Sequence, residues 1–526
     1  MINVDKGGLF LRRSKKMLYN TLLLTGASML MSAVGVAFQT YLAGRIGVAG
    51  IGLFQLIASA QMLAMTFALS GIRFATTRLV SEQLGRQGGC STVHGVMRRC
   101  FVHALLFGTA AAILLFWGAP WIGKSWIGDS RTILSLRILA VSLPFVASFA
   151  VMSGYFTAVG RVAKTVSGQV VQQMIRISLV VGLLIVRPPS GLEAAAATVV
   201  IGGIAAEVFS TLILFALYLR DKGKFLPKHS TGDEASGNNL TRRLLAISMP
   251  LAVSTYVRSG LNTLQHMLIP RGLRRAGTGG EDALAHYGIV HGMVFPIILF
   301  PSSLFYAVAE LMVPELTAAQ VAGQTERISH LVTKLLRIAI YIAVGLAGVF
   351  LVFGRELGTA IHPGEPEVGQ MIRVFALLMP IMFLDAISDG MLKGLGQQVY
   401  SMGVNIADSL ISVVLIFFLL PIFGVWGYVW IVYFTEAFNF GFSIYRIAKL
   451  TKIRLTIADF LKPALSILAA IQFTILALRT LNLPAGGVGN LVAHFLLAGL
   501  AYVLLLRALG CISRQDLRWA RKLVAK

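Results

Sequence analysis

Charged residues are scarce in this chain. Only 13% of its 526 residues are Asp, Glu, Lys or Arg, whereas 56% are hydrophobic. Soluble domains carry about 25% charged residues, so the composition excludes the soluble globular classes. The mean hydropathy of +0.78 instead predicts a protein that crosses a membrane many times.

Cysteine is rarer still, and long polar stretches are missing. Cys90, Cys100 and Cys511 all fall on the side of the membrane that we assign to the cytoplasm, so we expect no disulfide. Their spacing fits no metal site. Because no polar stretch exceeds a few tens of residues, we also expect no soluble domain. We expect no phosphate-loop motif of the form G-x-x-x-x-G-K-[ST], and therefore no ATPase domain, and we expect no cofactor.

Long apolar runs are abundant. They divide into about 14 predicted membrane-spanning helices of roughly 20 residues each. The predicted spans are 18–42, 51–70, 98–118, 133–158, 165–186, 193–219, 245–269, 284–309, 331–353, 369–391, 400–420, 426–446, 463–481 and 490–509. The fold class is therefore an all-α polytopic membrane protein. The first apolar stretch is too long for a signal peptide, so we expect it to be retained.

Basic residues concentrate in alternate loops. The net charge is +24, and 33 of the 46 Lys and Arg lie in the two tails, in one set of loops and in the adjoining helix ends. Those loops are 71–97, 159–164, 220–244, 310–330, 392–399 and 447–462. This asymmetry follows the positive-inside rule, so we expect both termini in the cytoplasm of a bacterial cell. The positive charge then predicts contact with anionic membrane lipids and no nucleic-acid partner.

One helical hairpin occurs twice. Residues 137–184 and 373–420 align without gaps at an offset of 236 residues, which is 373 minus 137. Several matched residues are of types that rarely coincide by chance inside apolar segments: Arg137, Ala140, Pro144, Ala150, Gly154 and Gly160 align with Arg373, Ala376, Pro380, Ala386, Gly390 and Gly396. A duplicated membrane unit is typical of transporters in which two equivalent lobes move against each other to give alternating access.

The duplication predicts the domain organisation. Six spans separate the two copies, so they share one orientation and form a parallel pseudo-two-fold repeat. We predict an N-terminal lobe of six helices at 1–219, a polar cytoplasmic linker at 220–244 and a C-terminal lobe of six helices at 245–447. Two extra C-terminal helices follow at 463–509, and 510–526 form a basic cytoplasmic tail.

Five segments resemble stage V sporulation protein B and related polysaccharide exporters. They begin TGASMLMSAVGVAFQTYLAGR (within 25–57), SGIRFATTRLVSEQLGR (70–86), SGQVVQQMIRI (167–177), LIPRGLRRAG (268–277) and HYGIVHGMVFPIILFPSSLF (within 286–320). The resemblance covers nearly the whole chain. It implies the multidrug/oligosaccharidyl-lipid/polysaccharide (MOP) exporter superfamily, with 14 helices in two six-helix lobes around a central cavity. It also implies flippase activity on lipid-linked glycans, and members near this chain are linked to spore cortex peptidoglycan.

The first span departs from that family. Relatives often carry arginines at places that correspond here to Ser32 and Gln39. If those arginines hold the pyrophosphate of the substrate, this chain must use other cations or a different headgroup geometry.

Two arginines near the bilayer middle are candidates to bind such a pyrophosphate. The planar guanidinium of arginine donates paired hydrogen bonds to phosphate and keeps its charge. Placing a charge near the bilayer middle costs free energy, so Arg176 in span five and Arg258 in span seven should each face a water-filled cavity or a charged partner. The alternative is a structural ion pair, for which Glu207 in span six is the obvious partner of Arg176.

Further candidates lie at the cytoplasmic edge and on the uncharged polar faces. Arg73 and Arg78, where span two leaves the membrane, would collect an anionic headgroup; alternatively they are ordinary topology arginines beside lipid phosphates. Gln39 and Gln172 suit sugar hydroxyls but serve equally well as contacts between helices. His291 is a candidate to line the cavity.

The second lobe carries the oxygen-bearing side chains that a cation needs. Asn405 and Asp408 are three residues apart and share a helix face, and Thr435 and Glu436 follow in the next span. Hard cations take oxygen ligands, and a buried carboxylate titrates readily. We therefore predict coupling to Na⁺ or a proton here; the alternative is hydrogen bonding between helices.

The sequence thus predicts a flippase, with no catalytic residues, that moves a polyprenyl-pyrophosphate-linked glycan across the cytoplasmic membrane. The glycan we expect is a peptidoglycan precursor. One alternative is a cation-coupled multidrug antiporter of the same superfamily. Others are a membrane-embedded glycosyl transferase, against which the short outer loops argue, and a non-transporting scaffold for cell-wall synthesis enzymes.

Overall fold

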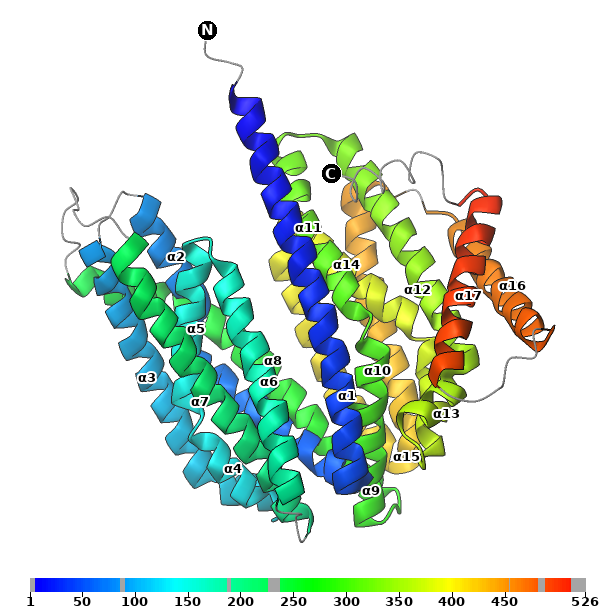
Figure 1. The fold of residues 1–526 in the computed structure, drawn as a ribbon, viewed down its shortest axis with the longest axis horizontal. Helices are drawn as coiled ribbons and strands as arrows, with labels where there is room; N and C mark the ends of the chain where they lie inside the picture. The colour runs from blue at the N-terminus through cyan, green and yellow to red at the C-terminus, as the bar shows by residue number, and fades with distance from the viewer. Residues whose placement is uncertain are drawn as a thin grey trace. The chain divides into compact units, whose positions relative to one another are not determined.

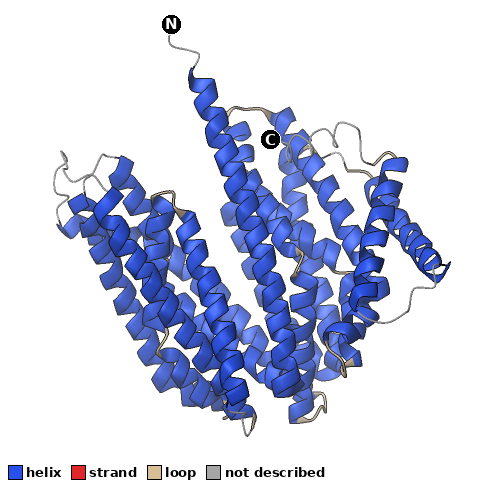
Figure 2. Ribbon diagram, in the orientation of Figure 1, coloured by secondary structure: helices blue, strands red, loops and turns tan. Residues whose placement is uncertain are grey.

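Every regular element in the described part of the chain is a helix, as the composition predicts. The computed structural model describes residues 5–85, 90–186, 191–225, 237–453, 455–480 and 488–511 (Figures 1 and 2). The helices are α1 Asp5–Leu69, α2 Ile72–Gly85, α3 Cys90–Trp121, the π-helix η1 Ile122–Ile127, α4 Thr132–Ala140, α5 Leu143–Ala158, α6 Val162–Val186, α7 Leu192–Phe225, α8 Gly237–Arg275, α9 Gly280–Gly288, the π-helix η2 Ile289–Val294, α10 Phe295–Leu299, α11 Ser302–Val321, α12 Thr325–Ile361, α13 Pro366–Ala376, α14 Met379–Gly394, α15 Gln398–Thr451, α16 Ala458–Thr480 and α17 Val488–Ala508.

Nine helices within the described ranges are long and apolar enough to cross a membrane, or up to eleven if each of two bent helix pairs counts as one span. Two of these helices hold two spans each. The 65 residues of α1 are enough for two spans of roughly 20 residues each and a further segment outside them. Dividing α1 and α15 at their kinks and adding the more polar α8 recovers the 14 predicted spans.

The kinks fall at glycines. Gly47 in α1 has φ 71° and Gly424 in α15 has φ 57°, both in the left-handed region that favours glycine. The predicted spans place each glycine inside a short loop, at 43–50 and at 421–425, but the structure has one helix with a kink at each of these places. The predicted loop 71–97 is likewise wrong in part, because α2 and the start of α3 occupy much of it. Hydropathy detects only the apolar part of a helix, so polar helix ends were assigned to loops.

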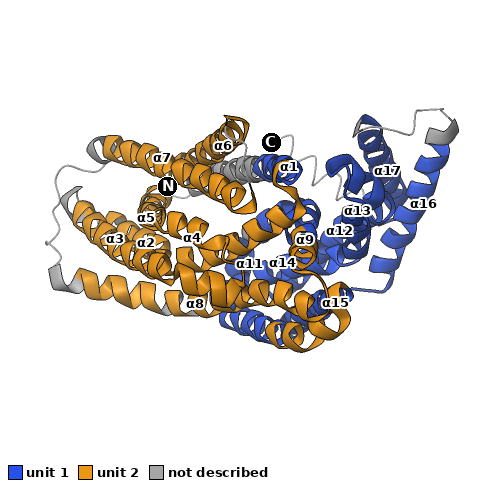
Figure 3. Cartoon of the chain, turned by 90° about the horizontal axis from the view of Figure 1, so that it is seen from below, with its two compact units in different colours: residues 1–44, 289–412, 426–526 blue, residues 45–288, 413–425 orange. Residues whose placement is uncertain are grey.

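The described chain forms two compact units (Figure 3). One, called unit 1, consists of residues 1–44, 289–412 and 426–526, and the other, unit 2, of residues 45–288 and 413–425. The two predicted lobes remain a prediction. Residues 226–236 of the predicted linker and 512–526 of the predicted tail lie outside the described residues.

Within unit 2, α2 packs against α3, α5 and α8, and α5 also contacts α3, α6 and α7. Within unit 1, α12 contacts α13, α14 and α16, and α16 packs on α17. The two C-terminal helices are attached through glycines, because a Cβ on Gly345 or Gly348 would meet Tyr502 or Ile467 at 2.5 Å. Many large apolar side chains stay exposed, such as Trp117 at 78%, as a hydrocarbon environment allows.

The duplicated hairpin keeps the same turn in both copies. Gly160 after α5 has φ 72° and Gly396 after α14 has φ 69°. The N–H of the next residue donates to the carbonyl of Phe156 in one copy and of Leu392 in the other, at 2.8 Å in both. This is the Schellman motif, which needs a left-handed residue and therefore favours glycine.

The same hairpin keeps its bend and its closest packing contact. The helix pairs α4–α5 and α13–α14 bend by 46° and 56°, and a proline begins α5 and α14. A Cβ on Gly154 would lie 2.6 Å from the carbonyl oxygen of Arg73, and one on Gly390 would lie 2.5 Å from the Cβ of Ala309. Ala309 is 236 residues after Arg73, so the repeat also extends to the helices α2 and α11 against which the hairpins pack.

Residues Gly118–Ser125, GAPWIGKS, match the letter pattern of a nucleotide-binding phosphate loop. That loop follows a strand and opens a helix. Here the pattern begins inside α3 and continues into the π-helix η1, within a membrane-span candidate. The expectation that this letter pattern is absent is therefore wrong, but its helical setting does not indicate a nucleotide site.

Candidate functional site

Two of the predicted substrate arginines belong to unit 2 and are exposed. Arg73 lies in the first turn of α2, and Arg258 lies in α8. Among the described residues, neither guanidinium has an ion pair or a hydrogen bond. Both are therefore available to an anionic ligand.

The helix around Arg258 is fixed by hydroxyl groups. Thr263 donates to the carbonyl of Ser59 at 3.2 Å, and Thr66 donates to the hydroxyl of Ser259 at 3.1 Å. The ring of Tyr256 stacks on Phe67 with centroids 4.4 Å apart. These contacts hold α8 against the second half of α1. They position Arg258 without engaging its guanidinium.

Arg78 is placed differently from Arg73. Its Nε lies 3.3 Å from Glu82 Oε1, one helical turn away, and the other carboxylate oxygen of Glu82 pairs with Arg243 of α8. Arg78 is therefore part of a charged contact between α2 and α8. A role in binding the headgroup would require this contact to open.

Arg176 lies in α6 among polar partners. It donates to Gln173 Oε1 at 2.7 Å and interacts electrostatically with Glu207 of α7, the partner expected from the sequence. Glu207 in turn accepts from Gln61 Nε2 at 3.4 Å. This arrangement favours the structural alternative for Arg176. Gln172 is half-buried on the same helix.

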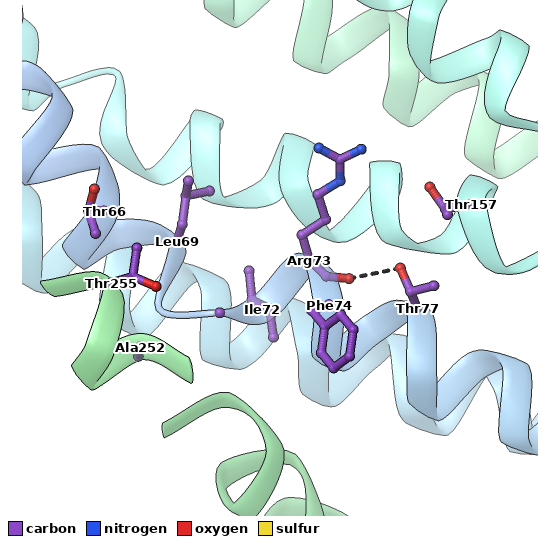
Figure 4. Close-up of a pocket in the computed structure, with 10 residues that line it drawn as sticks. Thr66, Leu69, Ile72, Arg73, Phe74, Thr77, Thr157, Ala252 and Thr255 are labelled. Carbon is purple, nitrogen blue, oxygen red and sulfur yellow. Dashed lines mark hydrogen bonds between the residues drawn. The ribbon is translucent and has the colours of Figure 1, made fainter. Parts of the chain in front are cut away.

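A pocket of about 400 Å³ opens beside Arg73 (Figure 4). It is bounded by the end of α1, the connector at Gly71, the start of α2, the end of α5 and one face of α8. Arg73 is the one charged side chain among the residues that line it. Figure 4 shows Arg73 and Phe74 leaving α2 on opposite sides.

The predicted ion-binding residues all belong to unit 1. The charges of Asp385 in α14 and Asp408 in the first half of α15 both act on Glu436 in the second half of α15, so the three carboxylates lie within electrostatic range of one another. Asn405 Oδ1 accepts a hydrogen bond of 3.2 Å from Asn439. Thr435 is buried and donates to the carbonyl of Val432 at 3.2 Å.

His291 also belongs to unit 1. Its Nε2 lies 2.9 Å from the hydroxyl of Tyr428, and the charge of Glu436 acts on that tyrosine. The structure therefore places His291 with the carboxylate group. Gln39 lies in unit 1 as well, half-buried in α1, and its Nε2 has no hydrogen-bond partner among the described residues.

The sequence reasoning missed Tyr428 and Asn439. Asn439 is three residues after Glu436 on one helix, so helical spacing would have found it. Tyr428 gave no such signal, because its partner His291 is 137 residues away. A fourth carboxylate, Asp389, is already neutralised by Lys393 Nζ at 2.6 Å and also accepts from Ser401.

A second charged group lies outside the spans, between α3 and α4. Asp129 accepts from the backbone N–H of Arg131 at 2.9 Å and from its Nη2 at 2.7 Å, and Arg131 also reaches Glu281 at 3.3 Å. Burial alone would raise the pKa of Asp129, but these hydrogen bonds and the positive charges of Arg131 and Arg274 outweigh it. The pKa of Asp129 is therefore below its usual range.

A duplicated helical hairpin, a series of helices long and apolar enough to span a membrane, exposed arginines in α2 and α8 and a half-buried carboxylate group define the class of protein: a multi-pass helical membrane transporter. Comparison with known sequences agrees. The chain belongs to the polysaccharide biosynthesis protein family, whose sequence model matches residues 17–320. A second model, MatE, matches residues 275–418. The expected membership of the MOP exporter superfamily is confirmed.

Similar proteins extend over most of the chain. Stage V sporulation protein B of Bacillus subtilis (strain 168) is 25% identical over 78% of this chain and 79% of its own length. The structure of the lipid II flippase MurJ in an inward closed conformation has a TM-score of 0.70 at 12% identity, covering 93% of this chain and 99% of that one. An inward-facing MATE-family multidrug transporter has a TM-score of 0.63 at 15% identity, covering 81% and 96%. The structural likenesses establish the fold.

Proposed function

We propose that this protein is a flippase that moves a polyprenyl-pyrophosphate-linked glycan from the inner to the outer leaflet of the bacterial cytoplasmic membrane. The glycan is a peptidoglycan precursor, and the process it serves is synthesis of the spore cortex. Similarity to stage V sporulation protein B and to a lipid II flippase supports this choice of substrate.

The observation that carries the proposal is the pair of exposed arginines, Arg73 at the predicted cytoplasmic edge and Arg258 inside a predicted span, in a chain from this family. A cation inside a span, as predicted for Arg258, is expensive and is retained where it faces water or an anion. A lipid-linked glycan supplies that anion as its pyrophosphate. Arg258 then binds the phosphates during transport, Arg73 and Arg78 receive the headgroup, and Gln39 and Gln172 contact the sugar.

Movement follows alternating access. The two halves of the repeat open towards the cytoplasm, take up the headgroup and then open outwards. The polyprenyl tail stays in the hydrocarbon, so only the headgroup crosses. With both termini in the cytoplasm, an inside-negative potential drives an anionic headgroup outwards by about 2.3 kcal/mol per charge for every 100 mV.

The cluster of carboxylates in unit 1 binds the coupling cation, which is Na⁺ or a proton. Asp408 and Glu436 bring the negative charge, and Asn405 and Thr435 bring neutral oxygens. In the described ranges no three or more His, Cys, Asp or Glu side chains are arranged to hold a metal ion. Binding of Na⁺ therefore requires the neutral oxygens as ligands, whereas a proton needs one carboxylate alone.

Reconstitution tests the proposal. Purified protein in liposomes is given a labelled lipid-linked disaccharide-pentapeptide, with and without a membrane potential and gradients of Na⁺ and pH. We expect protein-dependent appearance of the glycan on the opposite leaflet. Failure to translocate under every gradient would contradict the flippase function.

A cation-coupled multidrug antiporter is the second candidate. The acidic group around Glu436 and the MatE match to residues 275–418 favour it. The exposed arginines of unit 2 oppose it, because a cavity for cationic drugs should not carry unpaired positive charge. Accumulation of an organic cation in the same liposomes, without glycan transport, would select this function.

A further inference from the structure

The pocket beside Arg73 has apolar walls because its threonines have engaged their hydroxyls elsewhere. Thr77 donates to the carbonyl of Arg73 at 2.9 Å and to that of Gly154 at 3.1 Å. Thr157 donates to the carbonyl of Ser153 at 2.8 Å. With Leu69, Ile72 and Ala252 completing the wall, little beyond the guanidinium is left to satisfy a polar ligand. The pocket therefore suits a hydrocarbon chain that begins at an anion.

Arg73 has no competing anion in this pocket. No carboxylate is among the lining residues, and Glu82, nine residues further along α2, is already shared by Arg78 and Arg243. The Arg73 side chain is exposed and without an ion pair in the described part of the chain. A phosphate entering here would meet a free guanidinium and no like charge, which is the arrangement that paired hydrogen bonds require.

Helix packing does not require an arginine at position 73. In the second copy of the repeat the corresponding contact, Gly390 against α11, is made by Ala309, whereas Gly154 meets Arg73 in the first copy. Lys393 takes the place of Thr157 in the second copy and is paired with Asp389 at 2.6 Å. The fold therefore tolerates alanine at this position, and the free cation is a property of the first copy alone.

The size of the pocket selects between two kinds of lipid. A volume of about 400 Å³ lies at the lower end of the range for small-ligand sites. It accommodates one chain next to a phosphate and is small for a glycerol backbone that carries two chains. A polyprenyl phosphate has a single chain attached directly to its phosphate. This is the lipid that matches the pocket in both shape and charge.

We propose that this pocket binds the phosphate-proximal isoprene units of a polyprenyl-phosphate lipid, with Arg73 on the phosphate. The proposal rests on the proposed function and deepens it, because it separates a docking site for the carrier lipid from Arg258. The sugar is not recognised here. The pocket accepts any glycan carried on the same lipid.

The test uses a photoactivatable farnesyl phosphate on the full-length protein in phosphatidylcholine nanodiscs, with labelled peptides identified by mass spectrometry. We expect labelling in residues 66–77 or 252–255. Arg73→Gln should reduce labelling about tenfold, since a hydrogen bond to a charged group is lost. Ala252→Phe, which fills the pocket, should reduce it as strongly.

Matched controls keep the test falsifiable. Arg98→Gln removes an exposed charge from α3 of the same unit, and Ala246→Phe adds the same ring at an exposed position of α8. Both should label like the wild type. Equal labelling of the wild type and Arg73→Gln, with thermal stability unchanged, would overturn the proposal.

Competition distinguishes the sources of phosphate. Unlabelled farnesyl phosphate should compete, whereas farnesol and inorganic phosphate should not. If phosphatidic acid competes as well as farnesyl phosphate, the assignment to a polyprenyl lipid is wrong. Glycan transport is measured separately, with the same protein variants reconstituted into liposomes. Transport without labelling would overturn this site alone, whereas labelling without transport would overturn the proposed function and leave the site in place.

Discussion

Lys164 and Asp221 form an ion pair of 2.6 Å across 57 residues of chain. The carboxylate of Asp221 is only 1% exposed and is also paired with Arg161. The contact ties the turn of the first hairpin copy to the end of α7. In the second copy, Arg446 ties the corresponding turn through the neutral oxygen of Gln397, at 2.6 Å.

Replacing Asp221 should therefore destabilise the protein more than replacing Gln397. Asp221→Asn leaves two cations without their buried counter-charge, and we expect a loss of about 2 kcal/mol, reduced from the fully buried case because both cations are partly exposed. Gln397→Ala removes one hydrogen bond to a charged group. Thermal unfolding in detergent measures both variants, and an equal or larger loss for Gln397→Ala would contradict this account.

The duplicated glycines should be equally intolerant of a methyl group. A Cβ at Gly154 or Gly390 would meet its neighbouring helix at 2.6 or 2.5 Å, so alanine at either position should cost about 1–3 kcal/mol through overpacking. Gly182 in α6 is the control, because no atom lies within 4 Å of its Cβ position. Gly182→Ala should be neutral or stabilising, since alanine is the better helix former. Similar melting temperatures for all three variants would show that the close contacts do not matter.

The local structure of the duplicated hairpin could be predicted from the sequence. Matches at Gly160 and Gly396, and at Pro144 and Pro380, predicted a shared hairpin, and the structure shows the same cap and a similar bend. These features are local, so neighbouring residues determine them. Hydropathy also located the spans, because a bilayer imposes a fixed apolar length.

Contacts between distant helices were beyond prediction. Arg78 and Arg73 looked alike in the sequence, yet one is paired with Glu82 and the other is free among the described residues. The sequence predicts His291 as a cavity residue but does not indicate its partner, the hydroxyl of Tyr428, which lies 2.9 Å from its Nε2. Helical periodicity predicts which residues share a helix face. The partner of a side chain on another helix depends on how the helices pack, and this cannot be predicted from a single sequence.

Arg258 should be needed for transport but not for stability. Its guanidinium has no partner within the described ranges, so Arg258→Ala should leave thermal unfolding unchanged while lowering glycan transport at least tenfold, the effect of losing one charged hydrogen bond. Arg258→Lys should be intermediate, because lysine lacks the planar fork. Arg137 serves as the control; its guanidinium lies 5.5 Å from the ring centre of Phe116, and Arg137→Ala should transport normally. Full activity of Arg258→Ala would remove it from the site.

Glu436 should determine the response to an ion gradient. The neutral Glu436→Gln cannot release a proton or bind Na⁺ through charge, so its glycan transport should lose the acceleration that a pH or Na⁺ gradient gives the wild type. Asp389→Asn is the matched control, because Asp389 is already neutralised by Lys393 and its loss should leave the gradient response intact. Transport assays in liposomes, with and without an imposed pH or Na⁺ gradient, compare the two variants. An unchanged response in Glu436→Gln would place the coupling elsewhere.

Asp129 should make the connector between α3 and α4 sensitive to acid. Its pKa is lowered in the folded protein by Arg131, so ionised Asp129 stabilises the fold at any pH above the ordinary carboxyl value of about 3.9, and this contribution disappears as pH falls through the lower folded value. Asp129→Asn should therefore lower the melting temperature at pH 7, by an amount corresponding to about 2 kcal/mol, and the difference from wild type should shrink below about pH 4. The exposed Asp282 of α9 provides the control, and Asp282→Asn should change little at either pH. A difference between wild type and Asp129→Asn that persists undiminished at pH 3 would mean that shape, and not the charge of Asp129, holds the connector.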